Sequence, residues 1–297
     1  MIDKLEFLIA LARERHFGRA AEACGVTQPT LSAGIKQLEA EFNTLLVNRG
    51  ARYVGLTPEG ERVLEWARRI VGDARAMRQE VLSMRQGLTG HLRIAAIPTA
   101  LAMVPMLTTP FRERHQGVRF TVLSRTSAEI MGLLENLEAD AGLTYLDNEP
   151  LGRVRTMPLY RERYRLLTSP DGPFGDRAQV SWAEVARVPL CLLTPDMQNR
   201  RILDRLLSLE GPAPVPTMES NSMIALVAHV RTGKWASVMP ENLVRTLGLE
   251  PTIKMVPIVA PEVTHTIGLA VLDRDPLTPL CDALLREATR LVPSLLD

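Results

Sequence analysis

Residues 17–39 read FGRAAEACGVTQPTLSAGIKQLE and contain two short helical patterns separated by a tight turn at Gly25-Val26. The first pattern is small and apolar on one side, and the second begins at Thr27. Two helices that cross steeply over a short turn form a helix-turn-helix, whose second helix enters the DNA major groove. Glycine-containing helical hairpins are also common on protein surfaces, so this stretch alone leaves both interpretations open.

The second helical pattern has the start, the buried face and the polar face that a recognition helix needs. Thr27 can cap its free N–H groups, and Pro29 falls in the first turn, where no donor is missed. Leu31, Ile35 and Leu38 recur at helical spacing and predict one buried face. Amides, hydroxyls and lysine can bond bases or phosphates. The DNA contacts predicted from this helix are Thr27, Gln28, Pro29, Thr30, Ser32 and Lys36.

The flanking sequence carries further motifs in a fixed order. They are Leu5, Phe7, Phe17, Ala20-Ala21, Gln28-Pro29, Ser32, Leu38-Glu39, Arg49 and Leu56-Thr57 with Gly60. This set resembles the LysR-type transcriptional regulators, and the resemblance implies a winged helix-turn-helix over residues 1–58. The chain departs from the family pattern at Arg15-His16, Phe42-Asn43 and Leu46-Val47. Arg49 and Arg52 follow the recognition helix, where a wing would meet phosphates or the minor groove.

Composition indicates a folded protein whose predicted DNA-binding module is only weakly basic. The 297 residues are 46% apolar and 23% charged, enough for two or three domains with cores. Residues 1–57 carry seven basic and six acidic side chains, so we expect a modest salt dependence and a need for dimerisation. The sequence begins with no secretory pattern, and the prolines in the uncharged stretch 94–111 argue against a membrane span. We therefore expect a cytoplasmic bacterial protein.

Residues 59–90 are predicted to form a linker helix and a hinge. Thr57 can cap this helix and Pro58 can be its first residue. Apolar residues then recur at alternating steps of four and three, as in a heptad seam. The seam residues are Val63, Ala67, Ile70, Ala74, Met77 and Val81, followed by Met84. A single domain could also bury this face, but the resemblance implies a homodimer built on the helix, often paired again into a homotetramer.

Residues 91–297 alternate between strand and helix patterns, which predicts α/β layers with mostly parallel strands. We expect strands at 91–97, 118–123, 141–145, 154–160, 164–168, 190–194, 235–239 and 264–272, and helices at 100–115, 127–137, 197–209, 221–232 and 278–291. The resemblance implies an effector-binding domain like a type 2 periplasmic binding protein. Its first subdomain would cover 91–161 and 267–297, and its second 162–266.

Ligands of such folds bind at the carboxyl ends of strands, near helix N-termini that favour anions. Hydroxyls, amides and one arginine gather there and would suit a small anionic metabolite between the subdomains. Each residue taken singly could instead be an ordinary helix cap. The predicted effector residues are Thr99, Ala100, Ser127, Thr144, Thr194, Gln198, Asn199, Arg200, Ser220 and Asn221.

The sequence argues against an enzyme, although a helix-turn-helix fused to a catalytic α/β domain stays as the alternative. It contains no phosphate-binding loop, no dinucleotide fingerprint, no nucleophile elbow and no zinc-protease motif. The five histidines lack paired metal spacing, and Cys24, Cys191 and Cys281 read as buried free thiols. We expect no catalytic residue, metal or cofactor. The expected partners are a double-stranded promoter inverted repeat, a small effector, a second copy of the chain and RNA polymerase.

Overall fold

The structure is a computed structural model that describes residues 1–49, 53–209, 211–249 and 251–295. The chain forms two compact units. The first consists of residues 1–88 with the short segments 135–138 and 275–279, and the second holds the remainder of residues 89–297. Among the described residues, no helix combines the length and the apolar character needed to cross a membrane.

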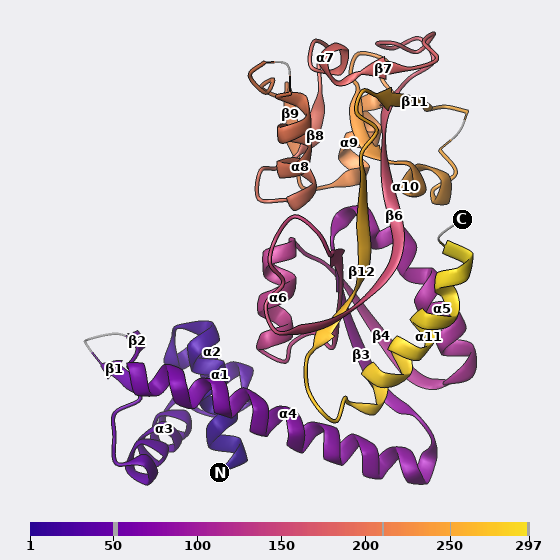
Figure 1. The fold of residues 1–297 in the computed structure, drawn as a ribbon. Helices are drawn as coiled ribbons and strands as arrows, with labels where there is room; N and C mark the ends of the chain where they lie inside the picture. Colours follow the sequence, from indigo (N-terminus) through magenta and orange to yellow (C-terminus); the bar gives the residue numbers. More distant parts are fainter. Residues whose placement is uncertain (50–52, 210, 250, 296–297) are drawn as a thin grey trace. The chain divides into compact units, whose positions relative to one another are not determined.

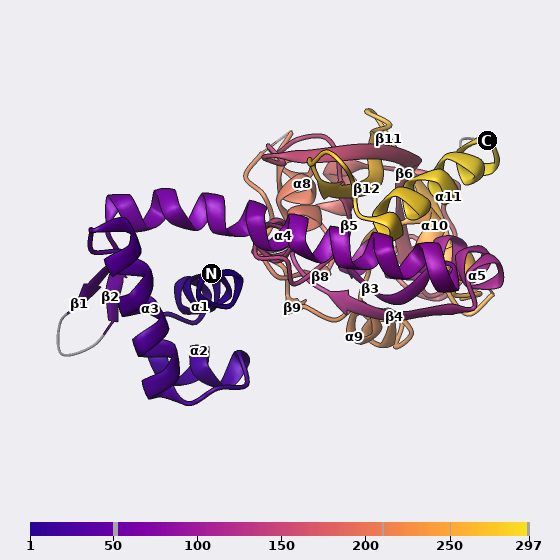
Figure 2. The same ribbon diagram turned by 90° about the horizontal axis from the view of Figure 1, so that it is seen from below.

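The first unit is a winged helix-turn-helix followed by a long helix (Figures 1 and 2). Its elements are α1 (Ile2–Glu14), α2 (Phe17–Ala23), α3 (Gln28–Phe42), β1 (Val47–Arg49), β2 (Tyr53–Leu56) and α4 (Pro58–Gln86). The antiparallel pair β1–β2 forms the wing. Thr57 Oγ1 accepts a hydrogen bond of 2.9 Å from Gly60 N and caps α4, with Pro58 in its first turn. The predicted fold class and helix starts are therefore confirmed.

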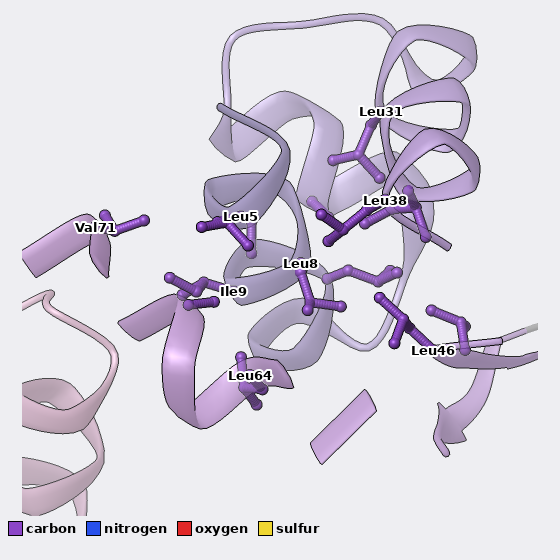
Figure 3. Close-up of a cluster of buried hydrophobic side chains, with 14 of the residues drawn as sticks. Leu5, Leu8, Ile9, Leu31, Leu38, Leu46, Leu64 and Val71 are labelled. Atoms are coloured by element: carbon purple, nitrogen blue, oxygen red, sulfur yellow. The ribbon is translucent and has the colours of Figure 1, made fainter. Parts of the chain in front are cut away.

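One apolar core holds this unit together (Figure 3). Leu31, Ile35 and Leu38 of α3 are fully buried against α1, as their helical spacing predicts. The N-terminal half of α4 completes this core with Leu64 and its neighbours. The recognition helix is thus fixed by its apolar face, which leaves its polar face to solvent.

Two glycines permit the close packing of these helices. A Cβ on Gly34 of α3 would come within 2.6 Å of the Phe7 ring on α1. A Cβ on Gly60 would come within 2.0 Å of the carbonyl oxygen of Leu46, a backbone atom that cannot rotate away. Gly60 therefore lets the start of α4 pass directly beside the start of the wing.

The second unit contains two groups of elements, which we call lobes, and two strands that run between them (Figure 1). Lobe I consists of β3 (Thr89–Ala96), η1 (Pro98–Met103), α5 (Val104–Arg114), β4 (Gly117–Ser124), α6 (Ser127–Glu135), β5 (Ala141–Tyr145) and α11 (Pro279–Leu295). Lobe II consists of β7 (Val180–Ser181), α7 (Trp182–Val185), β8 (Cys191–Leu193), α8 (Gln198–Leu207), β9 (Met218–Ser220), α9 (Met223–Val230), β10 (Ser237–Pro240), α10 (Glu241–Thr246) and β11 (Lys254–Val259). The connecting strands are β6 (Val154–Thr168) and β12 (Thr264–Leu272).

The sheet topology corrects the expectation of mostly parallel strands. The main sheet runs β4-β3-β5-β12-β6-β11-β7, with β10 also paired to β6, while β8 and β9 pair separately. β3 is parallel to β4 and β5, but β12 is antiparallel to β5 and β6, and β6 is antiparallel to β10 and β11. The sheet is mixed because β6 and β12 pass between the lobes in opposite directions. β6 is also one continuous strand where two were expected.

Candidate DNA-binding surface and effector site

The N-terminal half of α3 presents an exposed polar face. Thr27, Gln28, Pro29, Thr30 and Lys36 are exposed, and Ser32 is half-buried. Thr27 Oγ1 accepts a hydrogen bond from Thr30 N at 3.4 Å and lies 2.8 Å from Thr30 Oγ1, so it caps α3 as its position predicts. This face offers amide, hydroxyl and ammonium groups on a rigid helix, which is the chemistry that reads base edges and phosphates.

Two side chains to which the sequence analysis gave no structural role position this surface. His16 caps α2, because its Nδ1 accepts from Gly18 N at 3.1 Å and Arg19 N at 3.3 Å. Buried Glu39 near the end of α3 accepts from Leu46 N at 3.1 Å and Val47 N at 3.3 Å through Oε1. Glu39 therefore ties the recognition helix to the start of the wing. Arg52 and the side chain of Arg49 lie outside the described residues.

The long helix α4 uses two faces along its length. Leu64, Ala67 and Val71 are buried in the core of the first unit. This corrects the place of Ala67 in the predicted seam, because its side chain points into its own module. The remaining seam is open: Ile70 is 39% exposed, Met77 61% and Val81 52%. Val63 and Ala74 are half-buried, and exposed Trp66 and Met84 lengthen the apolar row.

A cavity of about 740 Å³ lies between the two lobes of the second unit. Its walls come from η1 and the start of α6 on lobe I, and from the starts of α8 and α9 with α10 on lobe II. The lining combines apolar residues such as Leu101, Met223 and Leu243 with charges on Arg125, Glu129 and Asp196. Such a mixture suits a small amphipathic ligand.

The predicted effector residues fall into three groups by their surroundings. Asn221 lines it directly, while Ala100 is buried and Ser220 is half-buried. The hydroxyls of Thr99, Ser127, Thr144 and Thr194 are buried without a hydrogen-bond partner. Gln198 and Asn199 are almost fully buried at the start of α8. Unpaired buried hydroxyls are costly, so they indicate partners from water or a ligand.

Arg200 does not serve the cavity, which corrects its predicted role. Its guanidinium bonds Asp204 Oδ1 at 2.7 Å, Glu219 Oε1 at 2.5 Å and the carbonyl oxygen of Leu193 at 2.8 Å. Two carboxylates within lobe II therefore neutralise its charge. An anionic ligand would find the cation already paired.

A buried polar cluster joins the lobes beside the start of α8. Tyr145 Oη donates to Glu162 Oε1 on β6, lies 3.1 Å from Tyr164 Oη and accepts from Asn199 Nδ2 at 3.2 Å. The imidazole of His265 packs against both tyrosines, with ring centroids 6.0 Å and 5.8 Å away. Burial raises the pKa of Glu162 to about 8. The alternating run Tyr160-Arg-Glu-Arg-Tyr164 could have indicated this inward carboxyl.

Contacts of α8 with the segment after β5 extend this junction. Gln198 Nε2 donates to the carbonyl oxygen of Asp147 at 3.2 Å, and Arg201 forms two bonds of 2.8 Å with the Glu149 carboxylate. A lobe II helix is thus held to the segment that follows β5 of lobe I.

Two family models together match nearly all of the chain. The model of the LysR substrate binding domain matches residues 85–292, and that of the bacterial regulatory helix-turn-helix protein of the LysR family matches residues 2–61. The chain belongs to the LysR family of bacterial transcriptional regulators. This LysR-family protein is a DNA-binding regulator with an effector-binding domain, and its relatives are regulators rather than enzymes.

Similar proteins include regulators named for peroxide. The LysR-family protein is 29% identical over 273 residues to the probable hydrogen peroxide-inducible genes activator of Mycobacterium avium, covering 90% of this chain and 86% of the relative. It is 26% identical over 280 residues to the DNA-binding transcriptional dual regulator OxyR of Escherichia coli K12, covering 93% and 90%.

Solved structures share the fold. A full-length OxyR with a cysteine-to-aspartate substitution, from Pseudomonas aeruginosa, superposes with a TM-score of 0.76 at 27% identity, covering 97% of this chain and 94% of that one. Full-length CbnR in complex with its target DNA gives a TM-score of 0.61 at 20% identity, covering 98% and 99%.

The three cysteines of this LysR-family protein form no disulfide bond with one another, and two of them are buried. Cys191 and Cys281 are buried, and Cys24 is half-buried. Burial raises the pKa of the Cys191 thiol to about 11 and also raises that of Cys24. Within the described residues, no group of three His, Cys, Asp or Glu side chains is arranged to hold a metal ion.

Proposed function

We propose that this regulator reads a promoter inverted repeat as a homodimer, with one α3 helix in the major groove of each half-site. The exposed polar face of α3 carries the proposal, because the opposite face is locked into the core. Thr27, Gln28, Pro29, Thr30, Ser32 and Lys36 form the proposed contact surface, with Arg49 and Arg52 in the wing. Two-fold protein symmetry requires two half-sites of matching spacing.

Dimerisation runs along the outer row of α4. Ile70, Met77 and Val81 expose apolar side chains at steps that a coiled pair of helices would bury. The nearly balanced charge of residues 1–57 favours the same conclusion, because one weakly basic module needs a second to gain affinity. We extend this proposal to the pairing of dimers into tetramers and to contact with RNA polymerase. A protein that binds promoters in a bacterium would be located in the cytoplasm.

A small ligand between the lobes controls the DNA-bound state. The cavity and the unpaired hydroxyls of Thr99, Ser127 and Thr144 support such a site. The proposal keeps the domain boundaries predicted from the sequence, at 58 and 90, and the predicted subdomains at 91–161 with 267–297 and at 162–266. A ligand that binds the closed arrangement of the lobes more tightly would shift the dimer toward it, and thereby change half-site spacing and DNA bending.

Control by ligand binding is favoured over control by thiol oxidation. Several relatives are named as hydrogen peroxide-inducible activators. In this chain, however, burial shields Cys191 and Cys281 and raises the pKa of the Cys191 thiol, so little reactive thiolate forms. Treatment with hydrogen peroxide should leave its DNA affinity unchanged. A shift in affinity that a Cys191→Ser variant abolishes would contradict this.

DNA selection tests the central proposal. The full chain is incubated with a random-sequence library, and recovered fragments should contain an inverted repeat. Gln28→Ala should relax the preferred sequence, because a bidentate amide contact distinguishes adenine from other bases. Lys36→Ala should weaken binding to every sequence and reduce the salt dependence. An unchanged sequence preference in Gln28→Ala would remove that contact from the proposal.

A further inference from the structure

His16 places an imidazole at the start of α2, the first helix of the helix-turn-helix. The residue is exposed, and its Nδ1 accepts hydrogen bonds from Gly18 N at 3.1 Å and Arg19 N at 3.3 Å. An imidazole that accepts at one nitrogen carries its proton on the other, so Nε2 is an N–H donor. The cap therefore fixes both the orientation and the tautomer of the ring.

The ring of His16 lies beside the recognition helix. A Cβ built on Gly18 would come within 3.1 Å of His16 Cε1 and 3.6 Å of Gln28 Oε1. The imidazole at the start of α2 and the amide at the start of α3 therefore border the same glycine, and both residues are exposed. A larger residue at position 18 would crowd the ring, so Gly18 keeps this space open.

The Nε2 donor of His16 is open to a ligand. Within the part of the chain that the structure describes, the ring is hydrogen-bonded through Nδ1 alone. The guanidinium of Arg19 is turned back to Glu14, where its Nη2 donates to the carbonyl oxygen at 2.6 Å and its Nε lies 3.6 Å from Oε2. Since the ring itself takes the N–H groups of Gly18 and Arg19, the imidazole N–H is the donor that this turn offers.

The position of this donor matches the path of the DNA backbone. In helix-turn-helix proteins the recognition helix enters the major groove, while the first helix crosses the backbone. The start of α2 beside Gln28 would therefore meet phosphates that flank the groove, and phosphate oxygens accept hydrogen bonds from such donors. The sequence departs from the LysR pattern at Arg15-His16, so the imidazole is a feature of this chain.

We propose that His16 donates from Nε2 to a DNA phosphate beside the major groove, once in each half-site. The inference rests on the proposed placement of α3 in the groove and adds a contact outside that helix. Nδ1 holds the start of α2 while Nε2 holds the DNA, so one ring positions the first helix on the backbone. This tautomer is neutral, so the contact adds affinity without releasing a counterion. A phosphate contact adds no sequence preference, because every base pair carries the same phosphates.

Two variants that keep the helix cap test this contact on the full chain. Asn and Asp both cap helices, but Asp has no donor and adds a negative charge. Affinity is measured for a duplex with the inverted repeat recovered by selection, and for a scrambled duplex of the same length. His16→Asn should bind both duplexes about tenfold more weakly and His16→Asp about 100-fold, without a loss of thermal stability. His91→Asn, which replaces an exposed histidine of the second unit, is the matched control and should bind as wild type does.

Phosphate ethylation gives an independent readout. Ethylation of one phosphate in each half-site should block binding of the wild-type protein, and the block at that phosphate should disappear in His16→Asn. The slope of log affinity against log salt concentration should stay unchanged in His16→Asn, because no charge is removed, whereas Lys36→Ala should reduce it.

The outcomes separate this contact from the placement of α3. Wild-type affinity in both His16 variants, or a loss of affinity that only follows a loss of thermal stability, would overturn the contact. Weaker binding to the inverted repeat alone would assign His16 to a base and overturn the phosphate contact. If only the His16 variants lack an effect, the placement of α3 stands. If Gln28→Ala and Lys36→Ala also lack an effect, that placement fails as well.

Discussion

Replacement of Glu39 measures how strongly the recognition helix is tied to the wing. The Glu39 carboxylate accepts from Leu46 N at 3.1 Å and Val47 N at 3.3 Å, and all three residues are buried. Glu39→Ala would leave both N–H groups without this acceptor at the point where the chain enters β1. Each hydrogen bond to a charged group contributes about 1.5–3 kcal/mol to stability, and two are lost here. The variant also no longer buries a carboxylate, which offsets part of that loss. We therefore expect the free energy of unfolding to fall by about 3 kcal/mol.

The conservative variant separates hydrogen bonding from charge. Glu39→Gln keeps a carbonyl oxygen that can accept, so it should lose only about 1 kcal/mol. Urea unfolding of the full chain, with Trp66 fluorescence as the probe of the first unit, measures both values. Trp182 and Trp235 belong to the second unit, and their replacement by Phe isolates the signal.

A neighbouring carboxylate provides the control. Glu41 pairs with Lys4 at the surface, where solvent screens the interaction, so Glu41→Ala should have a much smaller effect. Glu39→Ala should also weaken DNA binding, because the wing loses its anchor on α3. Equal losses of stability in Glu39→Ala and Glu41→Ala would refute the reasoning.

Three further predictions follow from other contacts. His16→Ala should lower the free energy of unfolding by about 1 kcal/mol while His16→Asn restores it, because Asn can cap α2, as urea unfolding will measure. Met77→Asp with Val81→Asp should convert the dimer to a monomer in light scattering, whereas Gln79→Asp, on the other side of α4, should not. Burial raises the pKa of Glu162 from 4.5 to about 8, so the folded state holds a proton that the unfolded state releases. Its stabilisation is complete below pH 4.5 and is lost toward pH 8, so wild type should lose about 1.4 kcal/mol more than Glu162→Gln between about pH 6 and pH 7 in urea unfolding.

Sequence features within a few residues of each other correctly predicted the helix starts and several strand bounds. Thr27 and Pro29 mark the start of α3, and the spacing of Leu31 and Ile35 marks its buried face. Strands β5 and β12 have the predicted bounds, because both are short apolar runs with clear ends. These features depend on neighbours within one or two turns of chain, which a single sequence displays.

Pairing between distant strands was harder to predict. The charged stretch Arg161-Glu162-Arg163 interrupts the apolar pattern, so β6 was expected as two strands. In the structure the arginines point outward and Glu162 points inward, which preserves the alternation. The antiparallel partners of β6 come from residues 70 to 118 positions later, and no local pattern encodes that choice.

The candidate effector site also separates what residue type predicts from what depends on contacts in the fold. Residue type drew attention to the hydroxyls of Thr99 and Thr144, which are buried without a hydrogen-bond partner, and their contact with an effector stays a prediction. Arg200 has the right charge and position, but its partners Asp204 and Glu219 remove it from the site. A sequence indicates which groups can bind a ligand. Only the fold decides which of them are already bound to the protein.

Helix α4 illustrates why a correct pattern can still misplace a residue. The heptad steps run through Ala67, but the first half of α4 packs against the core of its own unit and also has to contact the proposed second subunit. In that half, Leu64, Ala67 and Val71 are buried against α1. Only the residues about a quarter-turn away around the helix can therefore contact a second subunit. Beyond Val71 fewer residues of α4 are buried against α1, and Met77, Val81 and Met84 are 61%, 52% and 79% exposed. The dimer contact should therefore be strongest in the C-terminal half of α4.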